Sequence, residues 1–251
     1  MEWRVFKVTD QEMRIAVQLA RAGYKNLSSE VNGYKCLLIE IHGDFEDNKN
    51  DDEKNKQHTS GYARVFENET TVVVSIQGTV LENGDMQHWS QQGLLQYESM
   101  RAMYENVAKA TFEKGKKLMF VGHSMGGMEA QMAAREFGAE AVAVNSLGLL
   151  PSVIKELNES DKIINFGKND TPNQVTYLNV DGEVLGELGE LANEMKKTVT
   201  YGPQYTVPTD KEFLEVLSQD MDRFSKPLSL MAKCINNCMA VFLFNGKTFY
   251  Y

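Results

Sequence analysis

Gly122-His123-Ser124-Met125-Gly126-Gly127 is the stretch that decides the fold of this chain. It follows the apolar run Lys117-Leu-Met-Phe-Val121 and precedes a segment of small and helix-forming residues, Gly127-Met-Glu-Ala-Gln-Met-Ala-Ala-Arg135. This order predicts a buried strand, a sharp turn and a helix. In a Gly-x-Ser-x-Gly turn, a larger side chain at either glycine would collide with the neighbouring strand or helix.

The turn makes Ser124 a candidate nucleophile. Its hydroxyl is expected to stand clear of the sheet, at a helix N-terminus whose field favours negative charge. The N–H of Met125 would point toward the place where an oxyanion forms, so Met125 is a candidate oxyanion-hole donor. A chance match to this short pattern is the alternative, and the flanking strand and helix favour a real nucleophile turn.

Length and composition bound the remaining possibilities. The chain has 251 residues, which suits one α/β domain, so we expect a single domain over residues 1–251. The formal net charge is −9 and there is no Lys/Arg cluster, which disfavours nucleic acid as a partner. The sequence has no apolar run of ~20 residues and no signal-peptide core at its start. We therefore expect synthesis in the cytoplasm, with non-classical export left open.

Nothing in the sequence indicates a metal or a cofactor. The three cysteines form no disulfide framework and have no histidine at ligand spacing, so we interpret them as apolar filler; they are Cys36, Cys234 and Cys238. The polar run over residues 44–57 lacks the central glycine of a calcium loop and is expected to be a surface loop.

Hydrophobic periodicity predicts alternating strands and helices along the chain. We expect helices over 9–23, 94–114, 127–135, 152–160 and 210–224, and strands over 61–66, 70–76, 117–121, 139–144 and 174–180. A hairpin around Asn245-Gly246 is expected to end the chain. This alternation implies a mostly parallel sheet, whose sites lie beyond the carboxyl ends of its strands. Ser124 and Asp181 both follow such ends.

With these residues in place, the chain resembles the class 3 (fungal-type) lipases and the related bacterial lipase-like α/β-hydrolases over residues 10–245. The family's Gly-His-Ser-Leu-Gly-Gly turn is matched here with Met125 for leucine, and its Val-x-Phe-Arg-Gly-Thr strand end is similar to Val74–Thr79 with Gln77 for arginine. The resemblance implies an α/β-hydrolase fold, with a mostly parallel central sheet and helices on both faces. It also implies that Thr79 contributes to the oxyanion hole.

The resemblance also indicates the catalytic acid. In the family it sits in an Asp-Pro-Val-like turn after a strand, and Val180-Asp181-Gly182-Glu183-Val184 is similar without the proline. Asp181 is therefore the candidate acid. An ordinary surface-turn aspartate is the alternative reading of Asp181, and Asp161 and Asp170 are weaker rivals for the role.

The base expected downstream of Asp181 is missing. All four histidines precede Ser124; they are His42, His58, His88 and His123. The related domains carry a late His-x-Met-x-x-Tyr pattern, which residues 237–242 match with Asn237 in place of histidine. An amide has no basic nitrogen near neutral pH. Three explanations stay open: an engineered inactive form, a natural pseudo-hydrolase, or a base from elsewhere, such as His88 or His42.

The resemblance implies a serine esterase or lipase of phospholipase type that cleaves acyl esters through an acyl-enzyme on Ser124, without a cofactor. Its substrate would be a lipid or other ester, reached through transient contact with a membrane surface. The alternative is a hydrolase-fold protein that binds an acyl ligand or a protein partner without turnover. Related domains also occur as exported bacterial effectors held inactive by an inhibitory partner.

Overall fold

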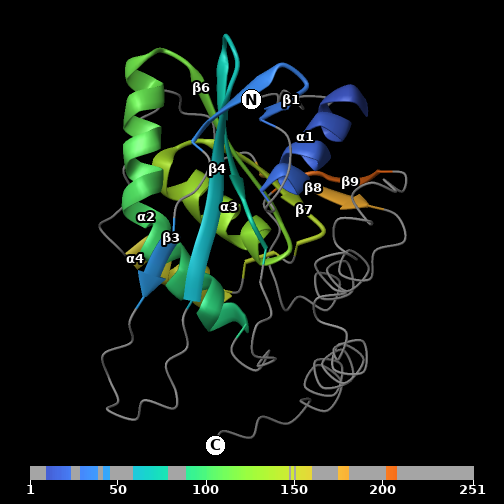
Figure 1. Ribbon diagram of the computed structural model, residues 1–251. Coiled ribbons are helices and arrows are strands. Elements are labelled where there is room, and N and C mark those ends of the chain that lie inside the picture. Colours follow the sequence, from blue (N-terminus) through green and yellow to red (C-terminus); the bar gives the residue numbers. More distant parts are fainter. Residues whose placement is uncertain are drawn as a thin grey trace, which may run out of the picture.

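The computed structural model of the protein describes residues 10–23, 29–38, 42–45, 59–78, 89–146, 148–149, 151–159, 175–180 and 202–207. Within these ranges, nine strands form one sheet in the order β1-β2-β4-β5-β6-β7-β8-β9, with β3 paired beside β4 (Figure 1). The antiparallel strands are β1 (Glu30–Val31), β2 (Tyr34–Leu38), β3 (His42–Phe45) and β4 (Thr59–Glu67).

The other half of the sheet is parallel from β5 onward. Its strands are β5 (Thr71–Ile76), β6 (Lys117–His123), β7 (Glu140–Val144), β8 (Val175–Val180) and β9 (Gln204–Val207). Because these strands run parallel to one another, their carboxyl ends lie next to one another at one edge of the sheet. Parallel sheets of this kind carry their sites at that edge.

Helices cover both faces of the sheet. The connections after β5, β6 and β7 contain α2 (Trp89–Glu113), α3 (Met125–Phe137) and α4 (Pro151–Glu159). Right-handed crossovers between strands that advance in one direction put their helices on the same face, and the three share one apolar cluster. The opposite face packs against α1 (Asp10–Ala22) (Figure 1). This is the α/β-hydrolase architecture that the sequence predicts.

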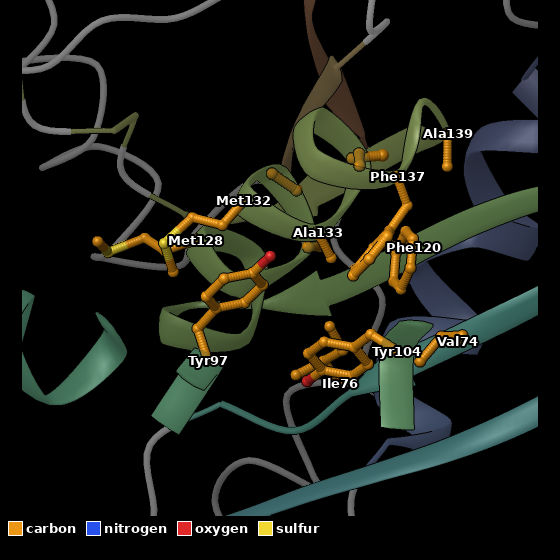
Figure 2. Close-up of a cluster of buried hydrophobic side chains, with 14 of the residues drawn as sticks. Val74, Ile76, Tyr97, Tyr104, Phe120, Met128, Met132, Ala133, Phe137 and Ala139 are labelled. Atoms are coloured by element: carbon orange, nitrogen blue, oxygen red, sulfur yellow. The ribbon is translucent and has the colours of Figure 1, made fainter. Parts of the chain in front are cut away.

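Aromatic and methionine side chains fill the core between α2, α3 and the sheet (Figure 2). The ring of Tyr104 on α2 meets Phe120 on β6 edge-on at a centroid distance of 5.6 Å. The neighbouring strand residue, Val121, belongs to the cluster on the α1 face, because side chains alternate along a strand. The methionine and tyrosine side chains on this face of α2, such as Met100 and Tyr104, therefore pack in the core.

The predicted strands and helices over residues 9–180 are confirmed, with differences at their ends. Helix α2 begins at Trp89, five residues before the predicted start. Asp44 and Phe45, predicted to open a surface loop, belong to β3, where their backbone pairs with β4. Strands β1, β2, β3 and β9 were not predicted. The predicted helix over 210–224 and the C-terminal hairpin lie outside the described residues.

Candidate active site

Ser124 is the single residue between β6 and α3, and its backbone is in an unusual conformation. Its φ is 55° and its ψ is −122°, which a non-glycine residue adopts only when its surroundings impose it. Three hydrogen bonds hold it there. The Ser124 N–H donates to the carbonyl of Val144 at 3.0 Å. The Ser124 carbonyl accepts from the N–H of Gly127 at 3.0 Å and from Oγ of Ser146 at 2.7 Å.

The glycines around Ser124 leave no room for a side chain. A Cβ at Gly122 would lie 2.1 Å from the carbonyl oxygen of Gly126, and a Cβ at Gly126 would lie 2.5 Å from that of Ile76. Both obstacles are backbone atoms that cannot move aside without shifting a strand or helix. The predicted steric reason for glycine at these two positions is confirmed.

The Ser124 hydroxyl is available for chemistry. Serine before a helix commonly caps it by accepting a hydrogen bond at Oγ, but the Ser124 side chain makes no capping bond to α3. The residue is partly exposed, whereas His123 and Met125 on either side are each 3% exposed. Met125 is the first residue of α3, so its N–H has no acceptor within the helix. A partly exposed hydroxyl thus adjoins an N–H without a helical acceptor.

The end of β5 lies against the first turn of α3. A Cβ at Gly126 would be 2.6 Å from the carbonyl oxygen of Gln77, and the Gln77 N–H donates to the carbonyl of Tyr62 at 2.9 Å. Gln77 is buried and the chain runs from it through Gly78 to Thr79. Thr79 itself lies outside the described residues, so its oxyanion role stays a prediction.

The end of β8 is fixed to the segment that follows β7. The N–H of Val180 donates to Oδ1 of Asn145 at 2.6 Å, and the N–H of Asn145 donates to the carbonyl of Leu178 at 2.8 Å. Since β7 separates β6 from β8, Ser124 and Val180 are about 10 Å apart across the sheet.

The remaining predicted acid and base positions are not described. Asp181 follows Val180 in the chain and lies outside the described residues, as does Asn237. The rival acids Asp161 and Asp170 lie outside them as well. The roles of these residues stay predictions.

Of the four histidines, the structure describes the side chain of His123. It is buried. It lies two residues after Val121 on β6, so its side chain points to the same face of the sheet as Val121, which packs in the cluster on the α1 face. His123 therefore lies behind the nucleophile turn, as expected of a packing residue. For His42 the structure describes the backbone of β3, while His58 and His88 lie outside the described residues.

Two buried acids on α3 were missed in the sequence. Glu129 is fully buried, and its Oε2 accepts a hydrogen bond from Oη of Tyr104 at 3.1 Å. Burial raises the pKa of Glu129 well above its ordinary value. Glu136 accepts hydrogen bonds from Tyr97 and Arg101. Both acids face α2 rather than the sheet edge, so they belong to helix packing.

Metal and membrane-spanning features are lacking in the described part of the chain. No three His, Cys, Asp or Glu side chains there come together as metal ligands. No described helix is long and apolar enough to cross a bilayer.

A family model indicates a phospholipase-like protein. The model of a phospholipase-like family, the Tle-like phospholipase domain, matches residues 15–221. Among solved structures, the chain is similar to the Rhizomucor miehei lipase propeptide complex, with 12% identity and a TM-score of 0.49 over 78% of this chain and 67% of that one. It is also similar to the Francisella virulence factor BioJ, with 13% identity and a TM-score of 0.31 over 82% of this chain and 83% of that one. No curated protein matches the chain significantly.

Proposed function

Because the chain belongs to the family of Tle-like phospholipase domains, a lipase-like group of lipolytic hydrolases, we propose that it cleaves acyl esters of lipids through Ser124. One observation carries the serine mechanism. Ser124 stands alone between β6 and α3 at φ 55°, held by its neighbours, with a partly exposed hydroxyl that does not cap the helix. A strained serine between a strand and a helix is the nucleophile arrangement of α/β-hydrolases.

The proposed reaction proceeds through an acyl-enzyme. Oγ of Ser124 attacks the ester carbonyl carbon while a base takes its proton, and the oxyanion accepts hydrogen bonds from the N–H groups of Thr79 and Met125. The carbon–oxygen bond to the alcohol then breaks, and the alcohol leaves with that proton. Water attacks the acyl-enzyme in the same way and releases the carboxylic acid. Asp181 orients the base, as the finer resemblance to class 3 lipases implies.

The base position limits the activity of this sequence. Asn237 occupies the slot that the resemblance assigns to histidine, and an amide cannot take the serine proton. Loss of the base typically lowers turnover about 10⁶-fold, while the oxyanion hole and substrate binding leave roughly 10³ to 10⁴ over water. Turnover close to background is therefore expected unless His88 or His42 supplies the base.

Restoration of the base tests this function. Asn237→His should raise kcat toward short and long acyl esters by several orders of magnitude over the parent chain, and Ser124→Ala in that background should abolish the gain. No gain from Asn237→His, together with turnover in the parent that His88→Ala or His42→Ala abolishes, would move the base to that histidine. Equal rates in every variant would contradict serine catalysis.

A second function is favoured by the absence of any histidine after Ser124. In it, the protein binds an acyl ligand or a protein partner without turnover. A fluorophosphonate probe separates the two functions, since it labels an activated serine. Normal labelling of Ser124 would contradict the binding protein, whereas tight binding to lipid vesicles without labelling would support it.

The proposed substrate determines where the protein would act. To reach a lipid ester, the protein contacts a membrane surface transiently. An exported effector that an inhibitory partner holds inactive is consistent with the family. Phospholipid and glyceride substrates are distinguished by assaying both in the Asn237→His variant.

A further inference from the structure

Asn145 joins two functional parts of the sheet edge. It follows β7, is 1% exposed and has a φ of 43°, a left-handed conformation that asparagine tolerates better than most residues. We propose that Asn145 is a positioning residue that ties the carboxyl end of β8 to the turn carrying Ser124. Its catalytic consequence rests on the proposed function, whereas the tie itself does not.

The Asn145 side chain supplies one hydrogen bond of the ladder between β7 and β8 in place of its backbone carbonyl. In a regular parallel pair, a residue donates its N–H to one strand neighbour and accepts at its own carbonyl from a residue two further on. Asn145 makes the first bond normally, from its N–H to the carbonyl of Leu178 at 2.8 Å. The N–H of Val180 then bonds at 2.6 Å to the side-chain oxygen Oδ1. The backbone is therefore free to turn away while β8 stays paired to its last residue.

The residues on either side of Asn145 hold the nucleophile turn. The Val144 carbonyl accepts from the N–H of Ser124 at 3.0 Å, and Oγ of Ser146 donates to the Ser124 carbonyl at 2.7 Å. Three consecutive residues thus bind Ser124 on one side and Val180 on the other. A displacement of residues 144–146 would therefore shift Ser124 relative to Val180.

The side-chain amide nitrogen of Asn145 does not explain the need for asparagine at this position. Its Nδ2 is buried and has no hydrogen-bond partner within the described ranges, and a buried donor without an acceptor is destabilising. A hydrophobic residue would avoid this, but it would leave the Val180 N–H without Oδ1. The acceptor atom is therefore what the position requires. Asp181 follows Val180 directly, so whatever fixes Val180 fixes the start of the proposed acid turn.

A matched set of variants in the full chain tests the tie. Asn145→Gly permits the left-handed backbone and removes Oδ1, whereas Asn145→Asp keeps an acceptor and tolerates the same backbone. Asn32→Gly is the control, because Asn32 is also left-handed, at 47°, but is exposed in the turn between β1 and β2. The readouts are hydrogen exchange at the Val180 amide, and kcat and KM for p-nitrophenyl butyrate in the parent and Asn237→His backgrounds.

Asn145→Gly should speed Val180 exchange at least about tenfold and lower kcat about 10- to 100-fold, with KM within about twofold. Asn145→Asp should restore both, and Asn32→Gly should change neither. Unchanged Val180 exchange in Asn145→Gly would overturn the tie, and faster exchange with unchanged kcat would overturn the positioning role. If Ser124 is unreactive in every background, the proposed function has failed. Hydrogen exchange at the Val180 amide then tests the tie alone. The tie holds only if Asn145→Asp keeps the Val180 amide protected and Asn145→Gly does not.

Discussion

At the scale of single residues, the conformation of Ser124 depends on the absence of a Cβ atom at the glycines beside it. Gly126 is the sharpest case, because its absent Cβ lets α3 lie against the carbonyl oxygens of Ile76 and Gln77. The strained serine, the start of the helix and the end of β5 are thereby held in one place. The geometry of the site is set by backbone contacts before any catalytic side chain is considered.

Gly126→Ala should damage both fold and site. The new methyl would lie 2.5 Å and 2.6 Å from two carbonyl oxygens, so α3 or β5 must shift, at a loss of more than about 2 kcal/mol in the free energy of unfolding. Gly115→Ala is the control, because Gly115 has a φ of 67° and nothing within 4 Å, and it should lose only about 1 kcal/mol. Urea unfolding of both variants measures the difference. Equal losses would contradict the close approach.

Glu129 should make stability depend on pH. Below about pH 4 the carboxyl is protonated in both the folded and unfolded states. Above that pH the unfolded state releases the proton, while burial raises the folded-state pKa of Glu129 and keeps the proton bound. The contribution of Glu129 to stability therefore falls as pH rises, by up to about 1.4 kcal/mol per pH unit, until the folded state also ionises.

Glu129→Gln should remove this dependence. Relative to the parent, the variant should gain stability as pH rises from 4 to 7, as measured by urea unfolding at each pH. The same substitution at Glu98, an exposed position on α2, is the control for loss of a carboxylate from these helices. If the difference in free energy of unfolding between the parent and Glu129→Gln stays constant over this pH range, Glu129 is ionised in the folded protein.

Residue patterns could predict Ser124 and its glycines, because these residues are contiguous in the sequence, although the atoms that crowd Gly126 belong to Ile76 and Gln77. Asn145 could not be predicted as a tie, since its partner Val180 is 35 residues away and the bond exists only when β7 and β8 pair. The buried acids were missed for the same reason. Glu129 and Glu136 are ordinary helix residues by composition, and only the approach of α2 buries them.

At the scale of elements, α2 and α3 are joined by polar contacts inside an apolar interface. Glu136 near the end of α3 is 4% exposed and accepts hydrogen bonds from Oη of Tyr97 and, at 2.7 Å, from Nε of Arg101. The Glu136 carboxylate raises the pKa of Arg101 and, together with burial, that of Tyr97. These bonds orient α2, whose Gly93 lies against the side chain of Met125.

Glu136→Gln should loosen this interface. Arg101 would keep its charge in a largely buried place and lose its nearer carboxylate, while Glu105 stays 3.7 Å from Nη1. Removal of one partner from a buried pair costs about 3 kcal/mol. Arg101→Met in the Glu136→Gln background should recover part of the loss, because the charge that lost Glu136 is then gone. A double-mutant cycle from urea unfolding measures the coupling, and strictly additive losses would mean that the pair does not stabilise the protein.

Element boundaries show which patterns mislead. Gly93 lies inside α2. Because glycine is a poor helix former, the sequence does not predict the first turn of this helix. In the structure, the missing side chain of Gly93 makes room for Met125, whose Cγ would be 3.3 Å from a Cβ there. The four residues of β9 are too few for their polar–apolar alternation to predict a strand, and they pair with the parallel edge of β8. Long apolar runs such as β6 needed no such context.

At the scale of the whole molecule, one sheet separates two apolar clusters. The cluster under α2, α3 and α4 includes Phe137, and the cluster under α1 includes Leu19 (Figures 1 and 2). Strands β5 and β6 contribute alternate side chains to both. Loss of packing on either face should therefore weaken the sheet for both, as expected of the single domain proposed for residues 1–251.

Leu19→Ala and Phe137→Ala, on opposite faces of the sheet, test whether the protein unfolds as a single domain. Both side chains are fully or almost fully buried, at 2% and 0% exposed, so each truncation should lower the free energy of unfolding by about 2 to 5 kcal/mol. Each variant should still unfold in one transition, with far-UV circular dichroism and tryptophan fluorescence coincident. If Leu19→Ala instead produced an early transition in one probe while the other kept the parent midpoint, the α1 face would unfold separately and the single-domain proposal would be wrong.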